Sequence, residues 1–261
     1  MLSAFGKNLE DIVGRAGKMI SKEGLTYNVY EKPGTANYVT DADRAVQDFL
    51  IKELSALVKG AHFVCEENEY SRNSIEKGTT FIIDPIDGTS NFLFGMNFSA
   101  VSVGAAEDGV LQAGAVYNPF TDEMFCAERG RGSFLNGKKI SAEDKPLGKG
   151  LLATDTSPYN PELRDKSFAL QKALSYHAMD IRNLGSAALS ICFAACGRCA
   201  AYYSFRLYAW DYAAAEIILT EAGGKACTLK GESAALAKTT TYLAGAPKAV
   251  EEILKEAEKL I

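Results

Sequence analysis

Residues 79–91 read TTFIIDPIDGTSN, an apolar run that passes directly into two carboxylates, Asp84 and Asp87, with a proline between them. A short continuous apolar run is typical of a strand buried on both faces, which lies in a sheet covered on both sides. The pattern D-P-x-D-G is also a common turn sequence. Taken alone, the stretch is therefore explained equally well by a structural turn and by a functional loop.

Helical and strand-like patterns alternate along the first half of the chain. Residues 2–24 carry apolar residues at helical spacing, and a polar loop containing Pro33-Gly34 precedes a second helix over 42–60. Short strands that end in acids are predicted at 61–67 and in the stretch quoted above. The segment 98–140 alternates β-branched and small residues, and it predicts an antiparallel meander within one sheet.

The second half repeats this alternation of strand and helix. Its elements are predicted at 150–156, 161–177, 180–184, 186–196, 200–205 and 210–224, with a closing strand and helix within 241–260. We therefore predict layers of helices around sheets, the natural packing of such elements. The chain shows no linker-like segment, so we expect one domain over 1–261, with halves of about 1–146 and 147–261.

Composition and charge limit the classes of function. The chain is 47% hydrophobic and 23% charged, as expected of a globular protein with a sizeable core, and its net charge is −5. That charge argues against a broad electrostatic contact with nucleic acid or an anionic membrane. No apolar run approaches the roughly 20 residues that span a bilayer, and no signal-peptide core is present, so we expect a cytoplasmic protein.

The six cysteines are predicted to be reduced thiols, because no secretory signal accompanies them. Cys192, Cys196 and Cys199 have a C-x3-C-x2-C spacing that zinc or a cluster would use. No histidine and no second C-x2-C lies near them in the sequence. We therefore interpret them as part of a packed helix that runs into a strand.

The polar residues at the ends of the predicted elements are mainly acids. The chain has only two histidines, and it lacks a G-x-S-x-G elbow, a P-loop and an H-E-x-x-H motif. Carboxylates gathered in one cleft must either be protonated or share a cation, and hard oxygen ligands suit Mg²⁺ or Mn²⁺. The candidate acids are Asp41, Asp43, Glu66, Glu67, Asp84, Asp87 and Asp211.

The D-P-I-D-G-T loop is suited to such a site. Pro85 fixes φ and bends the chain off the strand, so that both carboxylates and the Ile86 carbonyl can turn toward one point. Gly88 and Thr89 supply backbone N–H groups that can approach an anion at a helix start. A metal site and a phosphate-binding site would then lie side by side.

Five stretches together resemble the inositol monophosphatase-like family of magnesium-dependent, lithium-sensitive phosphatases. They are FIIDPIDGTSNF, WDYAAAEIILTEAGG, CEEN, YVTDAD and AVYNPFTDEMFCAERGRGSFLNGKKI, and they extend over nearly the whole chain. The resemblance implies an α/β (α+β) fold, the five-layer αβαβα sandwich of the inositol monophosphatase and fructose-1,6-bisphosphatase type. It also implies a homodimer that hydrolyses a small phosphate monoester, namely an inositol (cyclitol) or sugar monophosphate.

The resemblance assigns metal ligands to particular residues. The implied ligands are, for one metal ion, Glu66, Asp84 and the Ile86 carbonyl, and, for a second, Asp84, Asp87 and Asp211. A third, weaker ion is implied near Glu66. Glu67 is an alternative to Glu66, and Asp211 is also explained as a helix N-cap.

The same resemblance implies roles in catalysis. Thr89 and Asp43 correspond to the pair that orients water for attack on phosphorus, and Gly88 and Thr89 correspond to the phosphate-binding residues. A dication lowers the pKa of bound water, so hydrolysis needs no covalent phosphoenzyme. From the residues alone, Asp41 is as good a candidate as Asp43, and an acid at this helix start is also favoured by the helix dipole.

Substrate contacts are implied for Gly185, Ser186, Ala187, Ser204 and Arg206. Ser204 departs from the family pattern, because many inositol monophosphatases have a glutamate there that accepts hydrogen bonds from substrate hydroxyls. Arg206 has a planar fork of donors for a second phosphate or a carboxylate, and an exposed, ion-paired arginine explains it at least as well.

Several alternatives stay open on the sequence. Within the same fold they are fructose-1,6-bisphosphatase, histidinol-phosphatase and 3′-phosphoadenosine nucleotide phosphatase. A hypothesis of another class is a regulatory binding partner of transcription machinery, because some bacterial relatives associate with it. The expected partners are otherwise a small phosphorylated metabolite and a second copy of the chain, with no nucleic acid and no membrane.

Overall fold

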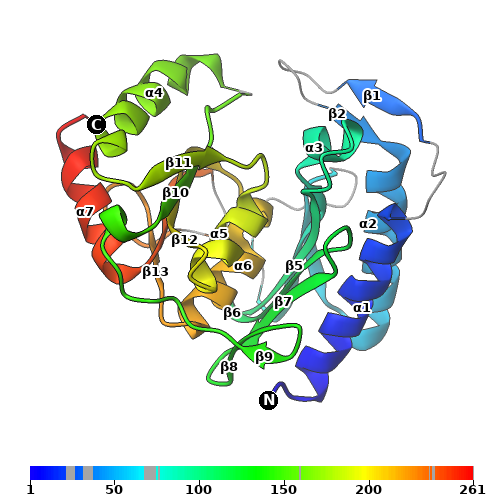
Figure 1. Ribbon diagram of the computed structural model, residues 1–261. Coiled ribbons are helices and arrows are strands. Elements are labelled where there is room, and N and C mark those ends of the chain that lie inside the picture. Colours follow the sequence, from blue (N-terminus) through cyan, green and yellow to red (C-terminus); the bar gives the residue numbers. More distant parts are fainter. Residues whose placement is uncertain are drawn as a thin grey trace.

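Two β-sheets and six of the helices form five alternating layers, which Figure 1 shows edge-on. The computed structural model describes residues 1–21, 27–31, 38–67, 75, 77–158, 160–234, 236 and 239–260. The end of the first predicted helix, 22–24, and the predicted Pro33-Gly34 loop lie outside the described residues. The five-layer αβαβα sandwich expected from the sequence is the fold observed.

Helices α1 (Ala4–Ile20) and α2 (Asp41–Leu57) form the first layer. They pack side by side against one face of a seven-stranded sheet (Figure 1). The start of α2 is fixed by reciprocal hydrogen bonds, because the Thr40 hydroxyl accepts from the Asp43 N–H and the Asp43 carboxylate accepts from the Thr40 N–H. This capping box satisfies two backbone donors that a helix start leaves without partners.

The second layer is the seven-stranded sheet, in the order β3-β4-β5-β6-β7-β8-β9. Its strands are β3 (His62–Cys65), β4 (Thr79–Asp87), β5 (Ala100–Glu107), β6 (Val110–Asn118), β7 (Glu123–Glu128), β8 (Gly132–Leu135) and β9 (Lys138–Lys139). β3 and β4 run parallel, and all the following neighbours run antiparallel. The meander predicted over 98–140 is thus confirmed.

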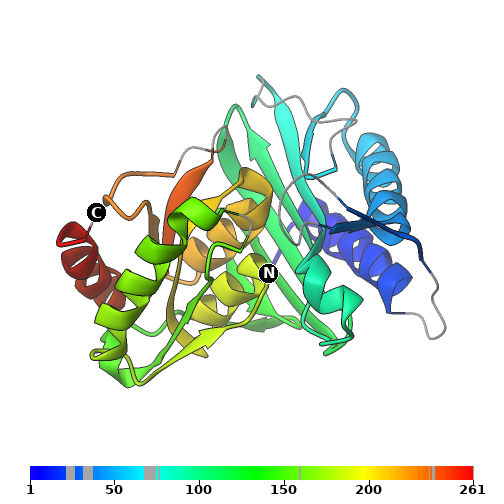
Figure 2. The ribbon, with the colours of Figure 1, turned by 90° about the horizontal axis from the view of Figure 1, so that it is seen from above.

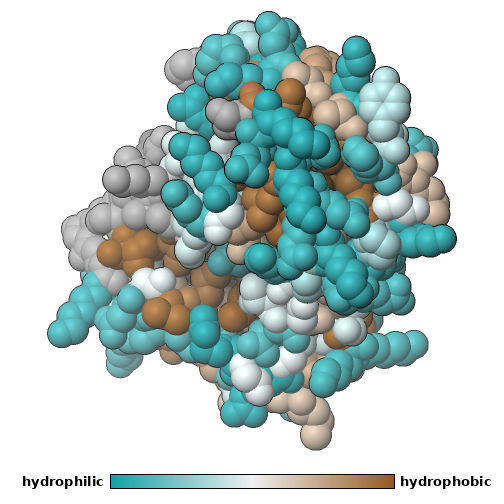
Figure 3. Space-filling model, turned by 90° about the vertical axis from the view of Figure 1, so that its left-hand side faces the viewer, coloured by the Kyte–Doolittle hydropathy of each residue, from teal (hydrophilic) through white to brown (hydrophobic). Residues whose placement is uncertain are grey.

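The fourth and fifth layers come from the second half of the chain. The five-stranded sheet has the order β11-β10-β12-β14-β13 and consists of β10 (Leu151–Thr154), β11 (Asp180–Asn183), β12 (Cys199–Leu207), β13 (Lys225–Cys227) and β14 (Thr240–Gly245). Its outer face is covered by α4 (Pro161–Ser175) and α7 (Pro247–Glu258). The molecular surface on this side is mainly hydrophilic, with hydrophobic residues showing between polar ones (Figure 3).

The middle layer lies between the two sheets, as the view from above shows (Figure 2). It consists of α5 (Ala187–Ala195) and α6 (Ala209–Glu221). Gly104 of β5 and Gly114 of β6 pair across the strands beneath α6. A Cβ on Gly114 would lie 2.4 Å from the Ala214 carbonyl oxygen and 2.6 Å from Ile217 Cγ2. The glycine pair therefore allows the α6 backbone to touch the sheet.

The shortest elements were not predicted from the sequence. They are β1 (Val29–Glu31) and β2 (Tyr38–Thr40), which form a two-stranded sheet, the 3₁₀ turn Leu147–Lys149, and β13. Segments of three residues are too short to show a hydrophobic period. The helix start expected at Gly88 and Thr89 is that of α3 (Thr89–Leu93). All six cysteines are free thiols, and Cys192 lies in α5 while Cys199 begins β12, as expected of a packed helix that runs into a strand. Among the described residues, no helix has the length and apolar character needed to cross a bilayer.

We predict that Gly114→Ala destabilises the protein by about 1–3 kcal/mol, the usual cost of an extra methyl group in a tightly packed core. At about 2–4 °C per kcal/mol for a chain of this size, the melting temperature falls by several degrees. Gly14→Ala in α1 is the matched control, because its Cβ would meet only Met124 Cε at 3.5 Å and alanine favours helix. Thermal unfolding compares the two. Equal melting temperatures for Gly114→Ala and the unaltered protein would contradict the close contact of α6 with the sheet.

Candidate active site

The parallel strands β3 and β4 bring two acids side by side at their carboxyl ends. Cys65 pairs with Ile83, so the next residues along, Glu66 and Asp84, are neighbours. The Glu66 N–H donates to the Ile83 carbonyl at 3.1 Å, which continues the ladder by one step. Asp84 is buried, whereas Glu66 is partly exposed.

A β-bulge lies between the two acids of the quoted stretch. Asp84 and Asp87 are three residues apart on β4, but they pair with residues only two apart on β5. Pro85 sits inside the bulge, where its missing N–H is tolerated. The prediction that Pro85 bends the chain off the strand is therefore corrected: the strand continues to Asp87, and the extra residue turns the acids. Asp84 Oδ1 accepts from the Ile86 N–H at 3.0 Å, which holds this shape.

Gly88 connects the bulged strand to α3 and is required on two counts. Its φ of +86° lies in the left-handed region, and a Cβ there would lie 3.0 Å from the Gly185 carbonyl oxygen and 3.1 Å from that of Phe98. Residues 185–187, which the sequence predicts to contact substrate, therefore lie beside this loop. Thr89 begins α3, and its hydroxyl donates to the Ile86 carbonyl at 3.1 Å.

The Asp87 carboxylate binds the N-terminus of α5, which lies 99 to 101 residues further along the chain. It accepts hydrogen bonds from the Ser186 hydroxyl, from the Ala187 N–H at 3.2 Å and from the Ala188 N–H at 2.9 Å. Ser186 is also the N-cap of α5, because its hydroxyl accepts from the Leu189 N–H. A helix N-terminus stabilises negative charge, so this contact joins the acid loop to the second half.

Asp43 and Asp211 occupy the same position in their helices. Each is the third helical residue and accepts the N–H of the residue before its helix, from Thr40 at 2.7 Å and from Tyr208 at 2.7 Å. The interpretation of Asp211 as an N-cap is thus wrong, because Tyr208 holds that position. Asp43 is fully buried, and its second oxygen, Oδ1, has no hydrogen-bond partner.

The structure separates Asp41 from Asp43, which the sequence left equal. Asp41 turns toward the β1 segment, where its carboxylate accepts from the Asn28 side chain at 2.7 Å. Burial raises the pKa of Asp43 to about 7, and the nearby charges of Glu66 and Glu67 add to the rise, although the hydrogen bonds from Thr40 oppose it. Asp43 is therefore the one that faces the other acids.

Burial and repulsion by neighbouring charges raise the pKa values of three of the gathered acids, Asp84, Asp87 and Asp211. The pKa of Asp84 lies well above its ordinary value, first because the carboxyl is buried. The charges of Glu66, Asp87 and Asp211 follow as further causes. Burial is also the main reason why the pKa of Asp87 is raised to about 6 and that of Asp211 well above normal, and Glu66 adds to both rises. These four acids form one electrostatic group, which we call the acid group.

The acid group fits a divalent cation by charge and by donor chemistry. All the neighbouring charges that raise the pKa of Asp84 are carboxylates, and a dication would remove that repulsion. The side chains do not form a closed coordination shell, since within the described part of the chain no three His, Cys, Asp or Glu residues are placed to hold a metal ion. In this structure, one oxygen of Asp87 accepts a hydrogen bond from the Ala188 N–H, and one oxygen of Asp211 accepts from the Tyr208 N–H.

Ser204 and Arg206 both make contacts within the protein. Ser204 is buried in β12, and its hydroxyl accepts from the Arg206 N–H at 3.2 Å, across an irregular step of the strand. The Arg206 side chain is exposed and donates to Asn160 Oδ1 at 2.5 Å and to Glu162 Oε1 at 3.3 Å. The ion-paired arginine that the sequence offered as one explanation is the arrangement present.

Asp155 is an acid near the group that the sequence analysis did not single out. It follows β10, where its carboxylate accepts from the Tyr202 hydroxyl at 3.1 Å and from the Ser157 N–H at 2.7 Å. Its charge contributes to the raised pKa of Asp211. The signal was present in the sequence, because the strand predicted at 150–156 runs into an acid just as β4 does.

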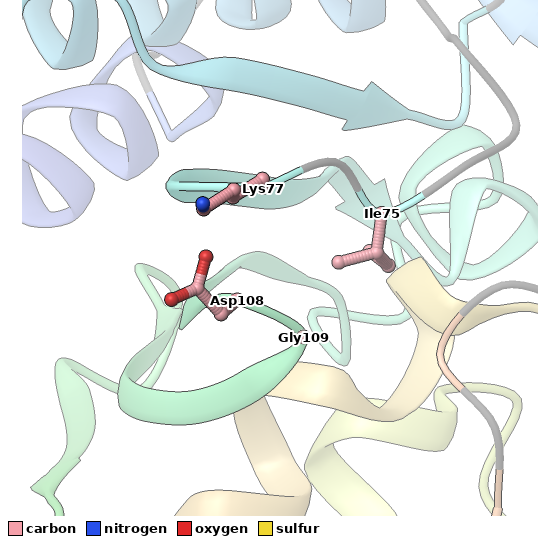
Figure 4. Close-up of a pocket in the computed structure, with 4 residues that line it drawn as sticks. All are labelled: Ile75, Lys77, Asp108 and Gly109. Carbon is pink, nitrogen blue, oxygen red and sulfur yellow. The ribbon is translucent and has the colours of Figure 1, made fainter.

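A separate pocket lies at the other end of β4 and does not share the acid group. It is lined by Ile75, Lys77, Asp108 and Gly109, at the turn between β5 and β6 (Figure 4). The Lys77 and Asp108 side chains point toward one another across it, and Asp108 Oδ1 accepts from the Gly78 N–H at 2.8 Å. Because the charges of Lys77 and Asp108 are opposite, the pair has no net charge that would favour a metal ion or a phosphate.

Comparison with known proteins identifies the family. The sequence profile of the inositol monophosphatase family matches residues 3–261. The chain belongs to this family. Human inositol monophosphatase 2 is 36% identical over 217 residues, which cover 80% of this chain and 75% of the human one. Nus factor SuhB of Pasteurella multocida (strain Pm70) is 34% identical over 224 residues, which cover 85% of this chain and 83% of that protein.

A solved structure of the same family agrees with the whole fold. The crystal structure of SaIMPase-II with inositol monophosphate bound superposes with a TM-score of 0.84 at 26% sequence identity. The superposition covers 98% of this chain and 94% of the other. Family membership and these likenesses show that the chain is a phosphatase, a phosphoric monoester hydrolase.

We predict that the metal-free protein loses stability as the pH rises from about 5 to about 8. Asp43 and Asp87 have folded pKa values of about 7 and about 6, above the usual value near 3.9 of an unfolded chain. The folded state therefore binds more protons than the unfolded state. The stability that this difference contributes is complete below about pH 4 and is lost as the pH rises through 6 to 7. Urea unfolding in chelator across this range measures the slope.

Asp43→Asn is the variant that tests the cause. Its amide does not titrate, so the slope becomes shallower than in the unaltered protein. A free energy of unfolding that rises with pH over this range would contradict this prediction, as would an unchanged slope in Asp43→Asn. Either result would show that burial does not raise the pKa values of these carboxyls.

Proposed function

We propose that this protein hydrolyses a small phosphate monoester, an inositol (cyclitol) or sugar monophosphate, with Mg²⁺ as its cofactor and Mn²⁺ as a substitute. The proposal rests on one observation, the gathering of four carboxylates, among which burial and neighbouring charges raise the pKa values of Asp84, Asp87 and Asp211. A cation bound beside such a group favours its ionised form. The names of the human relative and of the inositol monophosphate complex support the substrate class.

In this proposal the acid loop holds the metal. The proposed ligands are the carboxylates of Glu66, Asp84, Asp87 and Asp211 and the carbonyl of Ile86. When bound, Mg²⁺ lowers the pKa of water and offsets the charge that develops on phosphate oxygens. The hydrogen bonds from α5 hold the Asp87 carboxylate in place, so one ligand is oriented before any ion binds.

The protein's own groups prepare the attack on phosphorus. Asp43 is proposed as the general base, because Thr40 holds its Oδ2 with two hydrogen bonds while Oδ1 has no partner and can accept a proton from water. Its pKa of about 7 suits proton transfer near neutral pH. Thr89 orients the same water.

The N–H groups of Gly88 and Thr89 are proposed to bind phosphate oxygens. They lie at the start of α3, and a helix leaves its first N–H donors without backbone partners.

A second candidate function is a regulatory interaction with transcription machinery. A relative named Nus factor SuhB supports it. Of the two functions, only hydrolysis requires the acid group. A homodimer is likewise proposed, on the resemblance to the family alone.

We predict that Mg²⁺ restores phosphatase activity to chelator-treated protein on a panel of phosphate monoesters. Asp43→Asn lowers kcat by at least about 100-fold, the usual range for loss of a general base. Asp48→Asn, which changes an exposed acid on the same helix, is the control and keeps full activity. Asp84→Asn removes the dependence on Mg²⁺ together with the activity.

Steady-state assays with inorganic phosphate release measure these values, and Li⁺ added to the same assay tests lithium sensitivity. A folded, unaltered protein that is inactive on every ester with Mg²⁺ would favour the binding function. Full activity in Asp84→Asn would show that the acid group is not the active site.

A further inference from the structure

A fifth carboxylate, that of Asp155, faces the acid group from the second half of the chain. Thr154 of β10 pairs with Tyr203 of the parallel strand β12, so the next residues along are Asp155 and Ser204. Side chains alternate between the faces of a sheet, which puts Asp155 on the same face as Tyr202. Tyr202 and Ala153 belong to the core between the two sheets, where α5 and α6 lie.

Hydrogen bonds from Tyr202 and Ser157 fix the Asp155 carboxylate in this position. Tyr202 is 3% exposed, and its hydroxyl donates to Asp155 Oδ2 at 3.1 Å. The Ser157 N–H donates to Oδ1 at 2.7 Å. Each carboxylate oxygen has more than one acceptor position, so both remain able to accept a further donor. Asp155 itself is only partly buried, which leaves it accessible to a ligand.

The position of Asp155 is close to the proposed reaction centre. β12 leads directly into α6, the helix that carries Asp211, and the Asp155 charge acts on Asp211. The buried Tyr202 hydroxyl lies within the influence of Asp155, Asp211 and Asp87 alike. Asp155 therefore lies near the acid group, at the end of β10 and beside Tyr202.

None of the salt bridges among the described residues involves Asp155. Arg206, three residues along β12 from Tyr203, directs its guanidinium outward to Asn160 and Glu162. In this position the charge of Arg206 is balanced by Glu162. The end of β10 presents the negative charge and the hydrogen-bond acceptors of Asp155.

We propose that Asp155 is a specificity-determining residue that accepts hydrogen bonds from hydroxyl groups of the leaving group and excludes leaving groups that carry a second phosphate. The proposal rests on the phosphatase function proposed above. A carboxylate accepts strongly from hydroxyl groups, and it repels a phosphate held at short range. Selection among phosphate esters thus comes from the end of β10 and not from Arg206.

Asp155→Asn tests this with three substrates that share a phosphate monoester. Relative to the unaltered protein, kcat/KM falls about 10- to 100-fold on inositol 1-phosphate, because a charged hydrogen bond is weakened. It changes less than about threefold on p-nitrophenyl phosphate, which has no hydroxyl to bind, and it rises on fructose 1,6-bisphosphate. Asp165→Asn, which changes an exposed acid of α4, is the matched control and alters none of the three.

Tyr202→Phe is the second variant, because it keeps the carboxylate but removes the buried donor that holds it. It changes the kcat/KM values for the three substrates, relative to one another, in the same direction as Asp155→Asn does, but by a smaller factor. Equal losses on all three substrates, or unchanged ratios in both variants, overturn the role of Asp155. An unaltered protein that hydrolyses none of the three, p-nitrophenyl phosphate included, overturns the proposed function first and this inference with it.

Discussion

The hydrogen bonds between the Asp87 carboxylate and the start of α5 connect the two halves of the molecule at the site. Asp87 belongs to the first sheet, and Ser186, Ala187 and Ala188 belong to the middle layer. Because this contact draws the loop against α5, only glycine fits at Gly88, where the neighbouring backbone lies at 3.0 Å from a Cβ position. Strand register alone brings Glu66 beside Asp84, whereas Asp211 lies at the start of α6 in the second half, so its meeting with them depends on contacts between the halves.

The acid group is an arrangement that folding alone does not favour. Burial and repulsion raise the pKa values of Asp84, Asp87 and Asp211, and each raised value is a cost of keeping the carboxyl ionised in the folded state. Asp211 offsets part of this cost by accepting a hydrogen bond from the Tyr208 N–H at the start of its helix, as Asp43 accepts one from the Thr40 N–H. The same side chains thus stabilise the fold and belong to the proposed active site. This combination is expected where activity and stability make opposing demands.

The elements with a strong hydrophobic pattern could be predicted from the sequence, and the site could be predicted only in part. The meander over 98–140 and the long helices follow from periodicity, which extends over enough residues to be read. The bulge at Pro85 could not be seen, because strand pairing decides it. Asp155 follows a predicted strand, but its contact with Tyr202 depends on the pairing of β10 with β12, which the sequence does not show.

The sequence by itself determined the residue types at the site, the glycine after the second acid, and the alternation of helix and strand. Tertiary structure decided between Asp41 and Asp43, placed Glu66 among the acids that act on Asp84, and turned Arg206 outward to Glu162. The reason is physical. Charge interactions and burial depend on distances between segments far apart in the chain, and a local pattern contains no such distances.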